Sequence, residues 1–147
     1  MKTKTNELIG PALDWAVAKS EGKYVTTIAE FTAAWDSASR NNFRHRHEHL
    51  GEWIVLGQPG EVQALPKYFT DWAQGGPIIE RESLCVGRKH QADTNYCEVN
   101  DPAVDCWART TAGGYLSYGP TPLIAAMRCF VASKLGDEVD VPEELLS

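Results

Sequence analysis

The apolar positions near the C-terminus repeat with the spacing of an α-helix. Within 123–135 they recur every three or four residues, which places them on one side of a helix. Thr121 is a good N-cap residue, Pro122 suits the first turn, and Gly136 suits the position after the last turn. The pattern therefore predicts a helix over 123–135 that buries one face. The apolar positions of that face are Leu123, Met127, Phe130 and Val131.

The first part of the chain predicts a helix and then a strand. The helix is expected to begin at Pro11, directly after Gly10, and to stop at Gly22. Residues 24–28 are rich in Val and Thr and favour a strand. Residues 30–39 keep apolar residues at helical spacing, but their pattern is ambiguous.

The middle of the chain predicts several short elements. Residues 53–56, 84–86 and 106–110 are short runs typical of strands. Residues 77–82 are expected to form a short helical turn that begins at its proline. A polar loop and a tight turn complete the pattern, over 89–105 and 112–114.

Helices and strands are mixed without a regular strand–helix–strand repeat. This mixture favours an α+β fold, in which two main helices pack on a small antiparallel sheet. The chain has 147 residues, which is a usual length for one domain. We therefore expect residues 1–147 to form a single domain.

Charge is unevenly distributed along the chain. There are 14 Lys and Arg against 20 Asp and Glu, so the formal net charge is −6. Five of the acidic residues lie in 137–147, a segment without a base, and we expect this acidic tail to be a solvated end. An acidic protein is poorly suited to the phosphate backbone, so the charge disfavours a nucleic-acid partner. It leaves room for one small anionic ligand.

The sequence predicts a soluble cytosolic protein with no membrane partner. No stretch approaches the roughly 18–20 continuous apolar residues of a membrane span, and no apolar signal segment follows the N-terminus. The cysteines show no C-x-x-C spacing, so a structural zinc site is not indicated and free thiols are expected. They are Cys85, Cys97, Cys106 and Cys129.

No motif for catalysis is present. The chain lacks a G-x-S-x-G elbow, a Walker loop and a G-x-G-x-x-G fingerprint, so we expect neither an enzyme nor a cofactor. His45, His47 and His49 would share one face of a strand and could approach a metal there, whereas on a helix His45 would pair with His49. The favoured interpretation is an exposed basic segment that binds no metal.

Two segments are candidates for an anion site, 71–82 and 118–128. Each joins an aromatic residue, a Gly/Pro turn and a helix N-terminus, where free N–H groups suit phosphate or carboxylate. The aromatic residues could stack on a base, solvated arginines could reach the anion, and the glycines allow close approach. For the threonine, helix capping is favoured over ligand contact. The predicted ligand-binding residues are Trp72, Gln74, Gly75, Gly76, Arg81, Tyr118, Gly119, Thr121 and Arg128.

The alternative for these two segments is structural, because Gly/Pro turns before helices are common and the aromatic residues beside them usually pack. If a ligand does bind, useful affinity requires an enclosed pocket, for which the interface of a homo-oligomer is one option.

Three segments resemble the NinX-like family of small phage proteins. They are 13–19, 71–82 and 118–142, in the same order, and the last is long and specific. Residues 29–66 do not match the family pattern and are interpreted as a family-variable insertion. The resemblance implies a phage accessory protein acting in the host cytoplasm, and it supplies no catalytic residue.

Two functions from different classes follow. The first is a non-enzymatic binder of a small anionic, nucleotide-like ligand, which by analogy with other phage proteins could sequester a nucleotide-derived immune signal of the host. The alternative is a protein-binding modulator of a host or phage enzyme, which would use the acidic tail and the aromatic residues of 29–66. Those aromatic residues are Trp35, Phe43 and Trp53.

Overall fold

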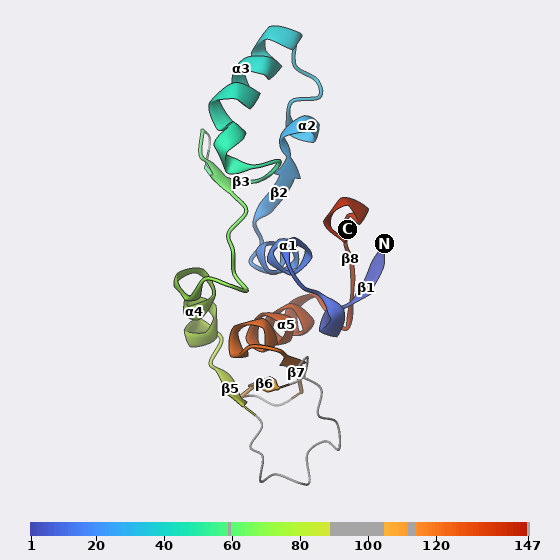
Figure 1. The fold of residues 1–147 in the computed structure, drawn as a ribbon, viewed down its shortest axis with the longest axis vertical. Coiled ribbons are helices and arrows are strands. Elements are labelled where there is room, and N and C mark those ends of the chain that lie inside the picture. The colour runs from blue at the N-terminus through green and yellow to red at the C-terminus, as the bar shows by residue number, and fades with distance from the viewer. Residues whose placement is uncertain (59, 89–104, 112–113, 147) are drawn as a thin grey trace.

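Helix α5 (Pro122–Leu135) runs through the centre of the molecule. The computed structural model describes residues 1–58, 60–88, 105–111 and 114–146, and Figure 1 shows α5 between α1 and the strands β5–β7. The Thr121 hydroxyl accepts from the Ile124 N–H at 3.1 Å and caps the helix, as predicted. Every residue from Leu123 to Ala132 is buried, so α5 is enclosed on all sides instead of burying one face.

A three-stranded antiparallel sheet covers one side of α5. Its strands β5 (Leu84–Arg88), β6 (Cys106–Thr110) and β7 (Leu116–Gly119) are ordered β5-β6-β7. Because side chains alternate along a strand, Ala108 and Ser117 are buried on the helix-facing side. Trp107 and its neighbours in register point the other way.

Helix α1 (Pro11–Ser20) lies against the opposite side of α5, as Figure 1 shows. The predicted start is confirmed: Gly10 adopts a φ of 64°, which suits glycine, and Pro11 occupies the first turn. Residues 12–18 are all buried, including one carboxylate, Asp14. The two helices and the sheet therefore form one layered core.

Residues 24–64 form a segment that extends to one end of the long axis in Figure 1; we call it the arm. Strands β2, β3 and β4 form its antiparallel sheet, and helices α2 and α3 and the short 3-10 helix η2 connect β2 to β3. The bounds are β2 Tyr24–Thr27, α2 Ile28–Phe31, α3 Ser37–His47, η2 Glu48–Leu50, β3 Trp53–Leu56 and β4 Val62–Ala64.

The ambiguous pattern over 30–39 becomes the end of one helix and the beginning of another. Helix α2 ends at Phe31, and α3 begins after Asp36, whose carboxylate accepts from the Ser39 N–H at 2.7 Å. An aspartate in that position favours a new helix start over continuation of the old helix.

The acidic tail is folded, so its interpretation as a solvated end is wrong. Strand β8 (Glu138–Asp140) pairs antiparallel with β1 (Lys2–Lys4). Val139, Val141 and Leu145 are buried, while the carboxylates of the tail point to solvent. The apolar residues between the acids therefore anchor the segment. Two 3-10 helices complete the ends, η1 Thr5–Glu7 and η4 Glu143–Leu145.

The α+β class is confirmed, although the described residues form three small antiparallel sheets rather than one. The predicted loop and turn, 89–105 and 112–114, fall largely outside the described residues, as does Cys97. Cys85, Cys106 and Cys129 are unpaired thiols. Within the described ranges, no helix is both long and apolar enough to span a membrane.

Phe130 tests the core. Its side chain is 1% exposed at the centre of α5, so Phe130→Ala should lower the free energy of unfolding by roughly 3–5 kcal/mol. The matched control is Leu135→Ala, because Leu135 lies on the same helix but is 40% exposed. Urea unfolding that gives both variants the wild-type midpoint would contradict the assignment of this core.

Candidate functional site

The two predicted anion segments do meet in the structure, but as packed elements. Helix α4 (Trp72–Arg81) begins five residues before Pro77, and the Asp71 carboxylate caps it by accepting from the Ala73 N–H at 2.9 Å. Gly75, Gly76 and Pro77 therefore lie inside a helix, and the prediction of a Gly/Pro turn there is wrong. The sequence signal for the true start was Asp71.

At two of the glycines predicted to contact a ligand, the space beside the Cα atom is occupied by other atoms of the protein. A Cβ at Gly75 would lie 2.7 Å from Leu123 Cδ1 and would also clash with the carbonyl oxygen of Tyr68. A Cβ at Gly119 would lie 2.9 Å from the Ala125 backbone nitrogen. These glycines allow α4 and β7 to approach α5 closely, so they are packing residues rather than ligand contacts.

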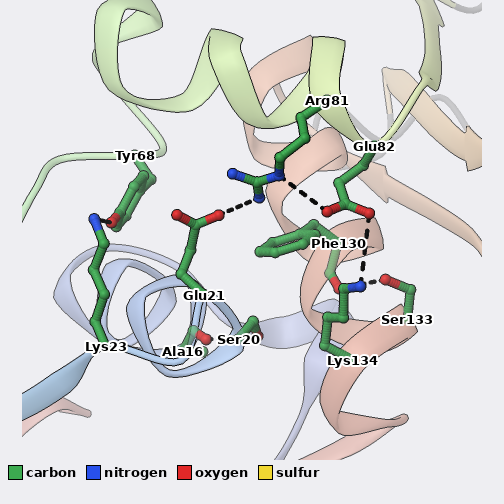
Figure 2. Close-up of polar contacts among 10 residues, drawn as sticks. All are labelled: Ala16, Ser20, Glu21, Lys23, Tyr68, Arg81, Glu82, Phe130, Ser133 and Lys134. Carbon is green, nitrogen blue, oxygen red and sulfur yellow. Dashed lines mark hydrogen bonds and ion pairs between the residues drawn. The ribbon is translucent and has the colours of Figure 1, made fainter.

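Arg81 is exposed, as predicted, but it is already paired. Figure 2 shows its guanidinium between the carboxylates of Glu21 and Glu82, with the Arg81 Nε to Glu82 Oε1 bond at 3.2 Å. Lys134 also approaches Glu82, at 3.7 Å, and both cations lie within 6 Å of the Phe130 ring. The hydrogen bond to Glu21 raises the pKa of Arg81 above its ordinary value. This network joins α1, α4 and α5.

Arg128 is a structural residue, which corrects the expectation of a solvated arginine. Its side chain is 7% exposed. Its Nε donates to the Leu8 carbonyl and its Nη1 to the Tyr118 carbonyl, both at 2.9 Å. Burial lowers the pKa of Arg128. Both donors thus connect the core to distant backbone and are not directed at a ligand.

The remaining predicted residues are dispersed. Trp72 and Gln74 are exposed on α4, and the Trp72 ring lies over Gly76 on the next turn. Thr121 caps its own helix, which confirms the favoured alternative. Tyr118 lies on the outer side of β7, facing away from α5. The predicted residues therefore do not line one open site.

The outer side of the sheet β5–β7 brings together a different group of residues. Trp107 and Tyr118 are partners in register, as are Arg109 and Leu116. The Trp107 indole lies across Gly87, where a Cβ would be 2.6 Å from Cζ2 of the ring. The guanidinium carbon of Arg109 lies 5.8 Å from the Trp107 ring centroid, within the range of a cation–π contact.

A hollow of about 480 Å³ opens at the end of this outer face. The Thr110 hydroxyl oxygen is buried and has no hydrogen-bond partner in the described part of the chain. The hollow combines a guanidinium, hydroxyls and an aromatic ring. Its lining residues are Cys85, Arg109, Thr110, Thr111, Gly114, Tyr115 and Leu116.

Sequence reasoning missed Trp107 and Arg109, although a signal was present. In β6 the small residues Cys106 and Ala108 alternate with Trp107 and Arg109. A strand with small residues on its buried side and large ones on the other presents the large ones outward.

Asp14 is a buried titratable group on α1. Its carboxylate is 5% exposed and accepts from the Phe69 N–H at 3.2 Å. Burial raises the pKa of Asp14 to about 7, although hydrogen bonds from the backbone of Phe69 and Tyr68 and the charge of Lys67 act in the opposite direction. The side chain thus attaches the segment before α4 to the core. A carboxylate within an apolar helical run was the signal for this role.

The histidine segment is helical rather than extended. His45 and His47 lie on α3, and His49 follows in η2. The His47 ring contacts the backbone of its own helix, because its Nδ1 lies 3.0 Å from the Phe43 carbonyl oxygen. Among the described residues, no group of three or more His, Cys, Asp or Glu side chains could hold a metal ion.

The described residues form a small α+β protein with an enclosed central helix and an open aromatic sheet face. The family described as "Bacteriophage P22, NinX" matches residues 4–134. Because this match covers most of the chain, the protein belongs to the NinX family of bacteriophage proteins, and the predicted resemblance is confirmed. No curated protein matches the chain.

The two arginines of the original prediction should differ sharply in their effect on stability. Arg128→Ala leaves two carbonyls without donors, at roughly 1–3 kcal/mol each, and should lower the free energy of unfolding by about 3 kcal/mol or more. Arg81→Ala removes exposed ion pairs and should cost about 1 kcal/mol or less. Urea unfolding of both variants measures the difference, and equal costs would contradict the structural role of Arg128.

Asp14 should make stability depend on pH. Its raised pKa means that the folded state binds a proton more tightly than the unfolded state, so this contribution to stability falls as pH rises from about 4 to above 7. Since one pKa unit corresponds to about 1.4 kcal/mol, the effect should reach a few kcal/mol. Asp14→Asn keeps an acceptor for Phe69 and should flatten the profile. An unchanged slope of unfolding free energy against pH in this variant would contradict the assignment.

Proposed function

We propose that the protein is a non-enzymatic binder of a small anionic ligand, and that the ligand binds the hollow on the outer face of β5–β7. In this proposal it is a phage accessory protein of the host cytoplasm. The class of ligand is a nucleotide or nucleotide derivative, in which a planar base accompanies a negative charge. Sequestering such a signal would serve the phage against host defence.

The availability of Arg109 carries this proposal. Arg81 is held by two carboxylates and Arg128 is buried. Arg109 is exposed, and its guanidinium lies over the Trp107 ring. No carboxylate in the described ranges neutralises it. A guanidinium stacked on an indole keeps its N–H groups free for a phosphate or carboxylate.

The shape and composition of the hollow support the same ligand class. Its volume of about 480 Å³ falls within the roughly 300–1,000 Å³ of small-molecule sites. A second hollow, of about 260 Å³, includes Asp137 and Glu138 in its lining, which disfavours an anion. Tyr115 is 39% exposed beside the first hollow and offers a surface for a base.

The hollow offers a ligand only a few contacts, so the affinity depends on how far the ligand is enclosed. A stacked base contributes roughly 1–3 kcal/mol and a hydrogen bond to a charged group roughly 1.5–3 kcal/mol. Leu116 is 49% exposed at the edge of the hollow. A second copy of the chain covering this edge would complete a deeper pocket, which is how a homo-oligomer would serve the proposed function.

The proposal is tested by calorimetry with ADP-ribose and a set of cyclic dinucleotides. At least one of these probes should bind, and Arg109→Ala should weaken it about tenfold or more, while the melting temperature stays within a few degrees. The control is Arg88→Ala, which removes an exposed arginine from the same sheet; Arg88 is the register partner of buried Cys106. Absence of binding by all probes, or equal affinity of the Arg109 variant, would overturn the proposal.

A further inference from the structure

Helix α3 lies at the surface along its whole length. None of its eleven residues, all of which are described, is buried. Figure 1 places α3 at the far end of the arm, away from α5 and from the sheet β5–β7. The folded core therefore gains little from the chemistry of the exposed side of α3.

The aromatic residues of the arm hold α3 in place. Phe43 lies 5.4 Å from Phe31 and 5.3 Å from Trp35, and His47 stacks 4.2 Å from Phe43, measured between ring centroids. Phe43 and His47 are one turn apart, so they define the inner side of the helix. These rings form a local cluster in which Phe43 is half-buried while Trp35 remains 38% exposed.

The outer side of α3 carries hydrogen-bonding and cationic side chains. At about 100° per residue, Asn41 and His45 lie opposite the aromatic cluster, and both are exposed. Arg44 and Arg46 border them on either side. There is no carboxylate between Ser37 and His47. The outer face of α3 is therefore a line of amide and imidazole groups between two guanidinium groups.

We propose that this outer face binds the major groove of double-stranded DNA. An α-helix about 10–12 Å wide fits a groove of about 12 Å, and eleven residues give a helix about 16 Å long. Asparagine presents a donor and an acceptor that match the edge of adenine, while flanking arginines reach phosphates. An apolar protein partner is disfavoured because the outer face lacks aromatic anchors.

Three acids lie near the ends of α3, namely Asp36, Glu48 and Glu52, and they limit how strong the binding can be. The Asp36 carboxylate is occupied by the backbone and hydroxyl of Ser39, at 2.7 and 3.0 Å. Glu52 pairs with Arg44, and both side chains are about half exposed, so a phosphate could replace this carboxylate at low cost. With only two or three phosphate contacts, binding should be modest and should weaken visibly with salt.

The test is fluorescence anisotropy with a labelled 20-base-pair duplex of mixed sequence, at about 50 and 200 mM salt. Wild type should bind, with a dependence of log affinity on log salt of about −2 to −3. Arg46→Ala should reduce that slope by about one, and Asn41→Ala should reduce discrimination between duplexes that differ in adenine content. Arg88→Ala, an exposed arginine outside the arm, should leave both quantities unchanged.

Three outcomes would overturn the proposal. They are absence of binding at 50 mM salt, an unchanged salt slope in Arg46→Ala, and equal losses in Arg46→Ala and Arg88→Ala. Retention of a host protein by wild type and by Asn41→Ala, with no duplex binding, would assign the arm to a protein partner instead. Nucleotide binding by Arg109 is unaffected by any of these results, so the two proposals fail independently.

Discussion

Burial of α5 on every side between Leu123 and Ala132 is the constraint on which the rest of the structure depends. A helix enclosed on all sides needs a covering layer on each, and α1, α4 and the sheet β5–β7 supply those layers from distant parts of the chain. Arg128 couples two of these layers, because one guanidinium inside this core donates to the Leu8 carbonyl before α1 and to the Tyr118 carbonyl in β7. A buried donor without its acceptors would be costly, so these segments are held in one arrangement.

That constraint also decides which residues remain for function. Positions 75 and 119 require glycine because α4 and β7 approach α5 closely there. Arg81 links the ends of α1 and α4 through its ion pairs with Glu21 and Glu82. Residues that looked suited to an anion are thereby used for assembly. Arg109 has no such structural role, because it extends from the side of the sheet that α5 does not cover.

Local pattern predicted the elements that local interactions specify. The Thr121 cap with the apolar repeat marks α5, and the short apolar run over 53–56 marks β3. Local pattern did not predict pairings between distant segments. The sequence of β8 alone indicates an acidic tail, and its strand forms by pairing with β1 from the other end of the chain. The prediction that a helix begins at Pro77 was wrong, because packing of α4 against the core outweighs the backbone hydrogen bond that the proline removes inside the helix. Burial of Arg128 could not be inferred from local pattern, since its Leu8 acceptor lies 120 residues away in sequence.

Net charge is likewise a poor guide to local structure, because it sums over residues that folding places far apart. The value of −6 disfavours nucleic acid only if the acids lie near the bases. Folding places five acids in the segment around β8, beside β1, and Figure 1 shows this segment well removed from α3. Salt screens the interaction between exposed charges that lie more than a Debye length apart, which is about 8–10 Å at ordinary salt. The charges that flank α3, namely its own arginines and the acids Asp36, Glu48 and Glu52, therefore bear more directly on its outer face than the net charge of the whole chain.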